Sequence, residues 1–331
     1  RDRDVTGVQT CALPISTTAQ IFSAAGVAVF PVVAPQLAAH LRVDPSWIGY
    51  QVSILFAVAT AMGPFVATIV LRQGGCRSLQ MAMLAGAVSM GVALVGTVPA
   101  IAVSSIFGGI SLGLVAAGSA HVCTRFAPPT HRNKVFSLKQ TGLPLAWALT
   151  ALVAPAMTLQ WGWQSAVALL IGCNLLTAAA LQGVREDWDD DRGAATARVP
   201  LTEGFLVLWR DKRLRSLSAS SFCFSVVQSC LSSFAVVMLV HDLGFNPVSA
   251  GLMLMLVQLA GICGRLFLGW FADATGRSVR ALGLSGLIAA ACCLVVPFID
   301  AAWPRPLMCV LFAIFGAAIF SWNGVFHAQL A

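Results

Sequence analysis

One arginine stands inside a long apolar run, where a charge is costly and usually marks a functional position. Arg265 belongs to the stretch 248–272 and lies eight residues before Asp273, which is about 12 Å along a helix. Its planar, permanently charged guanidinium can hold a carboxylate through two hydrogen bonds. We therefore expect Arg265 to bind an anionic substrate. The alternative is an internal structural pair, although no acid lies within an apolar stretch away from its ends.

A stripe of small polar side chains runs along the stretch 216–240. It consists of Ser218, Ser221, Ser225, Gln228 and Ser232, spaced 3, 4, 3 and 4 residues apart. This spacing places the side chains on one face of a helix. Small hydroxyl residues also pack membrane helices closely, so packing is the alternative to lining a cavity. We predict that the stripe lines a cavity and that Gln228 contacts the substrate.

Four further residues complete the predicted binding set. Gln258 shares a helix face with Arg265 because the two lie seven residues apart. Lys139 lies near the membrane edge, so it either contacts substrate or extends its long stem to the headgroups. Asn323 and Trp322 are predicted to line the cavity, with a packing role as the alternative. The ten cysteines form no paired CxxC motifs, so we predict neither a metal site nor a cofactor.

The amino-acid composition indicates which kind of structural element must position these residues. The chain is 58% hydrophobic and only 10% charged, whereas soluble domains are about 25% charged. Such a surface is solvated by lipid, and a helix of about 20 apolar residues crosses a bilayer. Ten stretches meet this need, which predicts an all-α membrane protein: 17–39, 47–71, 79–98, 100–123, 135–158, 163–183, 216–240, 248–272, 279–300 and 306–328.

The basic residues predict the orientation of the chain. Fourteen lie in the connections that follow even-numbered stretches, and two lie in the opposite connections. Connections rich in Lys and Arg stay in the cytoplasm, so we expect a multi-pass protein of the inner (plasma) membrane with a cytoplasmic N-terminus. The net charge of +7 then reflects topology and not nucleic-acid binding. Residues 184–215, the longest hydrophilic segment, are predicted to form a solvated cytoplasmic linker with a short interfacial helix near its end.

Residues 1–16 differ in character from everything that follows. Arg1 and Arg3 are offset by two acids, and no apolar core of about 7–15 residues precedes Pro14, which argues against a signal peptide. Read as codons, the DNA for Val5 to Ile15 resembles a common sequencing-library adaptor. We predict that residues 1–16 are a non-native cloning or assembly scar without organised contact with the helices. A disordered native tail is the alternative.

An internal repeat relates the two halves, 17–183 and 216–331. The segments 44–49 (DPSWIG) and 246–251 (NPVSAG) align with an offset of 202 residues, and the same offset places Gly74 on Gly276. In both copies Asp or Asn before Pro is predicted to cap a helix N-terminus. Both copies enter the membrane from the same side, so the repeat is parallel. Two parallel bundles joined by a charged loop form the architecture of one class of secondary transporter.

The stretch GWFADATGR, residues 269–277, resembles the G-x-x-x-D-x-x-G-R signature of the major facilitator superfamily. In the copy of this motif in the first half, residues 67–77, Leu71 occupies the position that corresponds to Asp273. The resemblance extends from residue 17 to the end and includes 136–145 and 322–324. It implies a fold of twelve spans. We therefore expect a chain truncated at both ends, whose second bundle (216–331) lacks the equivalents of the last two spans.

The resemblance also implies function. The family moves solutes by alternating access around a midplane site. Arg265 stands four residues before Gly269, which is similar to the arginine that meets the substrate carboxylate in monocarboxylate and oxalate-type facilitators. We expect a monomeric transporter, not an enzyme, that carries a small organic anion with a coupling proton or an exchanged anion. The alternatives are a multidrug exporter that uses acids of the missing spans, and a membrane sensor that has lost transport.

The signature further implies a conformational latch made of Gly269, Asp273, Gly276 and Arg277. Asp273 is expected to approach the first turn of 135–158, near Asn133 to Phe136, when the cytoplasmic side is closed. A helix N-terminus favours an anion by about 0.3–1 kcal/mol when exposed. Because Leu71 removes the corresponding acid from the first half, closure is expected to be asymmetric.

Overall fold

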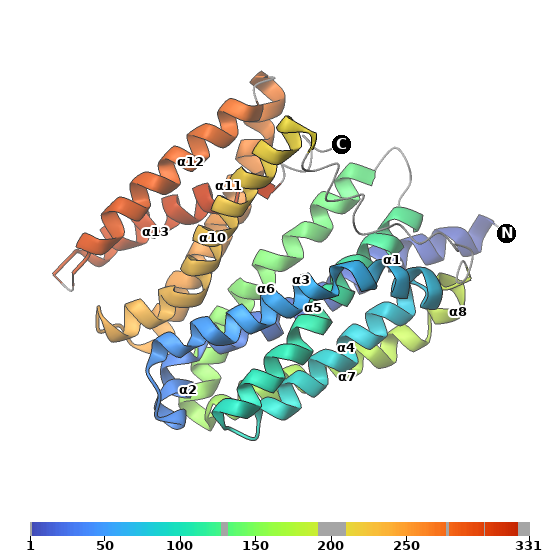
Figure 1. Cartoon of the computed structure of the whole chain (residues 1–331), viewed down its shortest axis with the longest axis horizontal. Helices are drawn as coiled ribbons and strands as arrows, with labels where there is room; N and C mark the ends of the chain where they lie inside the picture. Colours follow the sequence, from blue (N-terminus) through green and yellow to red (C-terminus); the bar gives the residue numbers. More distant parts are fainter. Residues whose placement is uncertain (1, 127–131, 191–209, 276–277, 301, 324–331) are drawn as a thin grey trace. The chain divides into compact units, whose positions relative to one another are not determined.

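The computed structural model describes residues 2–126, 132–190, 210–275, 278–300 and 302–323. Every regular element within these ranges is helical (Figure 1), which confirms the predicted all-α class. Eight of the helices described are long and apolar enough to cross a membrane. The chain is therefore a multi-pass membrane protein. It divides into two compact units, Arg1–Ala146 with Val153–Arg198, and Trp147–Leu152 with Val199–Ala331.

The helices follow one another in two groups along the chain. The first group is α1 (Asp2–Val32), α2 (Ala34–Leu41), the 3₁₀ helix η1 (Pro45–Trp47), α3 (Ile48–Gln73), α4 (Gly75–Ala93), α5 (Val98–Phe126), α6 (Arg132–Trp161), α7 (Trp163–Gln182) and α8 (Arg185–Trp188). The second group is α10 (Lys212–His241), α11 (Pro247–Thr275), α12 (Ser278–Val295), the 3₁₀ helix η3 (Val296–Phe298) and α13 (Arg305–Ile319). A helix thus occupies each of the ten predicted stretches.

Two predicted spans differ in detail from the helices observed. The stretch 17–39 is interrupted, since α1 ends at Val32 and α2 begins at Ala34. Pro35 has no N–H for the carbonyl of Pro31 and its ring clashes with that carbonyl, which breaks the helix there. The stretch 306–328 is also interrupted: α13 ends at Ile319, residues 322–323 are helical again, and residues 324–328 lie outside the described ranges.

The helix starts of the internal repeat have the predicted caps. The Asp44 carboxylate accepts a hydrogen bond from the Ser46 N–H at 2.8 Å. In the second copy the Asn246 side-chain oxygen accepts from the Ser249 N–H at 2.7 Å. Each bond satisfies a backbone donor that has no partner inside its own helix. The two copies begin differently, because the first starts with the 3₁₀ turn η1 and the second enters α11 directly.

The N-terminal segment is helical, and its last two residues contact the first unit. Residues 2–16 continue α1 as one helix, and the expectation of no organised contact is wrong at its end. Ile15 packs against the buried cluster that contains Leu79 and Val122. Ser16 is fully buried, with its Oγ 3.8 Å from the Cys123 Sγ. A packed helix extends at low cost, because each added residue gains a hydrogen bond without a new nucleation step.

The beginning of the predicted solvated linker is also docked on the first unit. Trp188 is 1% exposed, and Asp189 is buried beside it. The two Asp189 carboxylate oxygens accept from the Cys76 and Arg77 backbone N–H groups at 2.8 and 2.9 Å. These donors belong to the first turn of α4, whose positive dipole end favours an anion. The prediction of a solvated linker was therefore wrong for residues 188–189, and residues 191–209 lie outside the described part.

Candidate functional site

Close packing of α11 against α13 sets the position of Arg265 in the second unit. A Cβ added to Gly264 would lie 2.2 Å from the Ala317 carbonyl oxygen, and one added to Gly316 would lie 2.3 Å from the Val257 oxygen. Both distances are too short for any side chain. The two helices therefore touch backbone to backbone, as membrane helices do where small residues meet. This contact places the middle of α11 directly beside the end of α13.

Backbone carbonyls at the end of α13 accept hydrogen bonds from side chains of the second unit. The Phe320 oxygen accepts from the Arg265 guanidinium, through Nε at 3.4 Å and Nη2 at 3.3 Å. The Ala318 oxygen accepts from the hydroxyls of Ser285, at 2.7 Å, and Ser321, at 2.8 Å. Carbonyls at a helix end need such partners where no water is available. The helix end is thus held by polar side chains, and Arg265 is oriented beside it.

Two predicted residues from different helices meet near this helix end. The Trp322 indole N–H donates to the Gln228 side-chain oxygen at 3.1 Å. The Phe224 ring stacks on Trp322, with ring centroids 5.8 Å apart and an angle of 19° between the planes. Sequence reasoning missed Phe224. Its position, four residues before Gln228 on the same helix face, was the signal that could have revealed it.

Gln258 is the most unusual polar residue of the unit. Its side chain is 0% exposed. Within the part of the chain that the structure describes, neither its Oε1 nor its Nε2 has a hydrogen-bond partner. An unsatisfied buried amide costs about 1–3 kcal/mol, so an amide retained here needs a further partner. Asn323 follows Trp322 and is half-buried, while Ser232 is the buried member of the predicted stripe.

Lys139 lies in the first unit and is 4% exposed. The alternative in which its stem extends to the headgroups is therefore wrong. Its charge lies within electrostatic range of the Cys123 thiol, and the next residue, Gln140, accepts from the Gln20 amide at 3.4 Å. A buried ammonium in an apolar helix is expensive and is typical of functional positions. Lys139 thus remains a candidate for substrate contact.

The predicted latch is described only in part. Gly269 lies in α11, and a Cβ added there would meet nothing within 4 Å. The side chain of Asp273, all of Gly276 and Arg277, and the side chains of 133–136 lie outside the described part. The latch therefore stays a prediction.

Comparisons with known proteins give a consistent picture. The sequence profile of the Major Facilitator Superfamily matches residues 17–331. Two uncharacterized MFS-type transporters of Mycobacterium tuberculosis, from strains CDC 1551 and H37Rv, are each 25% identical to the chain, over 232 and 227 residues. The matches cover 70% and 68% of this chain and 51% and 49% of those proteins. The chain thus spans about half the length of the curated relatives it matches.

Solved structures share the fold at low sequence identity. A D-xylose–proton symporter matches with a TM-score of 0.69 and 18% identity, over 96% of this chain and 81% of its own. A bacterial homolog of the human lysosomal transporter Spinster, inward-facing and occupied, has a TM-score of 0.76 and 16% identity, over 96% and 73%. The xylose transporter XylE of E. coli, in a partially occluded inward-open conformation, has a TM-score of 0.72 and 16% identity, over 98% and 84%.

Proposed function

The chain belongs to the Major Facilitator Superfamily, and on that basis we propose that it forms a secondary active transporter of a small organic anion. The observation that carries the proposal is the placement of Arg265. Its guanidinium is held beside the end of α13 by the Phe320 carbonyl. Helix ends inside transporter bundles often serve as substrate sites, because their backbone groups and side chains can coordinate a polar solute.

The chemistry of arginine favours a carboxylate as the solute. The group stays protonated at every physiological pH and presents donors in a rigid fork that matches carboxylate geometry. The contact to Phe320 fixes the plane of the fork before substrate arrives, which reduces the entropy lost on binding. Gln258 lies seven residues away on the same face of α11, about 10.5 Å along the helix. Its buried amide supplies a neutral donor and acceptor to a second polar group of the substrate.

The remaining predicted residues have supporting roles in this proposal. Trp322, fixed by Gln228 and Phe224, offers an aromatic surface to the apolar part of the substrate. Lys139, a buried cation of the first unit, is a separate candidate for substrate contact. The basic connections indicate a cytoplasmic N-terminus in the plasma membrane, and the protein works as a monomer. Asp273, with Gly269, Gly276 and Arg277, forms the latch that closes the cytoplasmic side.

Uptake into proteoliposomes tests the proposal. Labelled mono- and dicarboxylates are supplied with a proton gradient or with unlabelled anion inside, which separates proton coupling from exchange. Arg265→Lys keeps the charge but loses the fork, so the apparent affinity should fall about tenfold or more, corresponding to about 1.4 kcal/mol. Arg265→Gln should abolish uptake. Arg305→Gln, at the exposed start of α13, is the matched control and should transport normally.

Three results would contradict the proposal in different ways. Unchanged uptake by both Arg265 variants would remove this residue from the site. Transport of cationic dyes without transport of carboxylates would favour the multidrug exporter. Binding of solute without flux, by correctly folded protein, would favour the membrane sensor. D-xylose serves as the neutral solute in the same assay, and its uptake at the expense of carboxylates would also overturn the anion assignment.

A further inference from the structure

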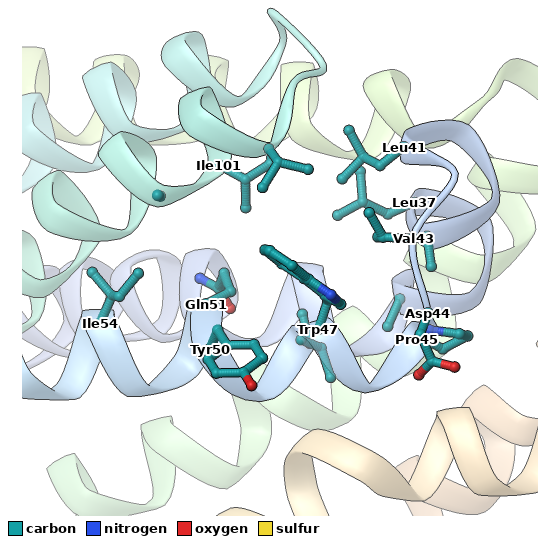
Figure 2. A pocket seen from close by; sticks show the side chains of 15 residues that line it. Leu37, Leu41, Val43, Asp44, Pro45, Trp47, Tyr50, Gln51, Ile54 and Ile101 are labelled. Carbon is teal, nitrogen blue, oxygen red and sulfur yellow. The ribbon is translucent and has the colours of Figure 1, made fainter.

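A cavity in the first unit lies apart from the residues of the proposed substrate site. It has a volume of about 70 Å³ and is enclosed by α2, η1 and the starts of α3 and α5. Trp47 and Ile54 stand on one wall, and Leu37 and Ile101 stand on the facing wall (Figure 2). One water molecule needs about 10–15 Å³ of such volume and two to four polar partners. The lining is almost wholly apolar, so the cavity favours an apolar occupant several carbon atoms in size.

The helix packing that surrounds this cavity recurs in the second unit. A Cβ added to Gly109 of α5 would lie 2.5 Å from the Leu55 carbonyl oxygen of α3. The corresponding contact joins α13 to α11, because a Cβ added to Gly316 would lie 2.3 Å from the Val257 oxygen. Leu55 and Val257 are separated by the 202 residues of the repeat. The two glycines are separated by 207 residues, so α5 corresponds to α13 with this second offset.

The turn that precedes each of these helix pairs also has the same backbone conformation in both copies. Arg42 has a φ of 56°, and Gly244, 202 positions later, has a φ of 67°. Both values belong to the left-handed region. The next residue is Val43 in the first copy and Phe245 in the second. These two residues therefore hold corresponding positions, and Val43 lines the cavity.

Two small side chains of the cavity wall correspond to two large side chains of the second unit. With the offset of 207 residues, Val98 at the start of α5, which also lines the cavity, corresponds to Arg305 at the start of α13. The Arg305 guanidinium lies over the Phe245 ring, 5.5 Å from its centroid. The second unit thus places an aromatic ring, covered by an arginine, where the first unit has two valines. The ring that the first unit lacks indicates the size and shape of an occupant.

The wall of the cavity suits an aromatic ring. Trp47 and Tyr50 both line it, with ring centroids 5.4 Å apart and an angle of 58° between the planes. Aromatic rings attract one another in tilted and offset arrangements. The two side chains are 45% and 66% exposed, so a ligand can enter beside them. Exposed Trp and Tyr side chains of membrane proteins lie at the level of the lipid headgroups, which a small apolar molecule dissolved in the bilayer can reach.

We propose that this cavity is a binding site for one uncharged molecule with a single aromatic ring. The ring lies against Trp47, between Leu37 and Ile101, and takes the place that Phe245 fills in the second unit. It completes the packing of α2 against α3 and α5. Its binding does not depend on Arg265 or on the identity of the transported solute.

Fluorine NMR of fluorobenzene, titrated against the full chain in lipid nanodiscs, tests the site. The unsubstituted protein should give one saturable bound signal above the background of empty nanodiscs. Val43→Phe supplies the ring from the chain itself, so it should weaken this binding by about tenfold or more. Val103→Phe adds the same ring at a position that is 44% exposed and outside the lining, and should bind fluorobenzene as the unsubstituted protein does.

Two further variants keep the proposal falsifiable. Ala102→Leu fills the cavity from α5 and should also weaken binding about tenfold, which tests the site even if Val43→Phe does not fold. Circular dichroism and thermal unfolding verify that each variant is folded. Arg265→Gln should bind fluorobenzene normally, which separates this proposal from the transport proposal. Three results would overturn the site: no saturable signal, equal binding by the cavity-filling variants and Val103→Phe, or loss of binding in Arg265→Gln.

Discussion

The buried carboxylate of Asp189 should contribute strongly to the stability of the first unit. It accepts two backbone hydrogen bonds at the start of α4, from Cys76 and Arg77. The neighbouring Trp188 is buried in the same core cluster, and its carbonyl accepts from the Arg125 guanidinium at 2.8 Å. The substitution Asp189→Ala removes both acceptors and leaves two N–H donors buried without partners.

The structure sets the size of the effect. A hydrogen bond to an ionised group contributes about 1.5–3 kcal/mol, so the loss of two predicts a destabilisation of about 3–6 kcal/mol. For a unit of 150–250 residues, each kcal/mol lowers Tm by about 2–4 °C, so Tm should fall by at least about 6 °C. Asp189→Asn keeps one oxygen acceptor without charge and should show about half of this loss.

Thermal unfolding of the purified protein in detergent, followed by intrinsic fluorescence, measures the effect. Asp187→Ala is the matched control, because Asp187 is an exposed acid of α8, the short helix that ends just before Asp189. The Tm of this variant should change by less than about 1 °C. A Tm of Asp189→Ala that matches this control would refute the reasoning, since buried donors left without acceptors cannot be neutral.

Two other predictions concern the second unit. Gly264→Ala places a Cβ 2.2 Å from the Ala317 oxygen, so α11 and α13 must separate. The yield of folded protein should fall well below that of the control Gly283→Ala, where an added Cβ meets nothing within 4 Å. Trp322→Phe keeps the stacking on Phe224 but loses the hydrogen bond to Gln228. This change should lower the unfolding free energy by about 1 kcal/mol and raise the apparent KM for substrate. An unchanged KM would place Trp322 outside the site.

The helices could be predicted from the sequence because segments that cross a lipid bilayer must be rich in apolar residues. Long apolar stretches, the caps at Asp44 and Asn246, and the arginine within α11 follow from local rules on hydropathy and hydrogen bonding. The break between α1 and α2 was also accessible, because Pro35 removes one N–H from the helix. Local rules were therefore sufficient to predict the all-α class and to identify Arg265 as the main candidate residue.

The contacts that sequence reasoning missed join residues far apart in the chain. The carboxylate of Asp189 binds amides more than a hundred positions earlier, and nothing in an acidic, hydrophilic stretch distinguishes this acid from its exposed neighbours. The burial of Lys139 was likewise hidden, because its distance from the membrane edge permits either a buried or an extended stem. The hydrogen bond between Trp322 and Gln228 depends on how α10 and α13 are placed, which periodicity does not determine.

The turn that follows α3 in the first copy of the repeat is held by an acid from outside that copy. Leu71 stands where the second copy has Asp273, so the first turn lacks an acid of its own. Asp189 supplies a carboxylate to that turn from beyond α7, entirely within the first unit. A contact inside one unit does not require a particular arrangement of the two units, whereas the proposed contact of Asp273 is expected to form when the cytoplasmic side closes. In the proposed latch the first turn therefore has no switchable acid of its own, and we expect the balance between open and closed states to depend on Asp273.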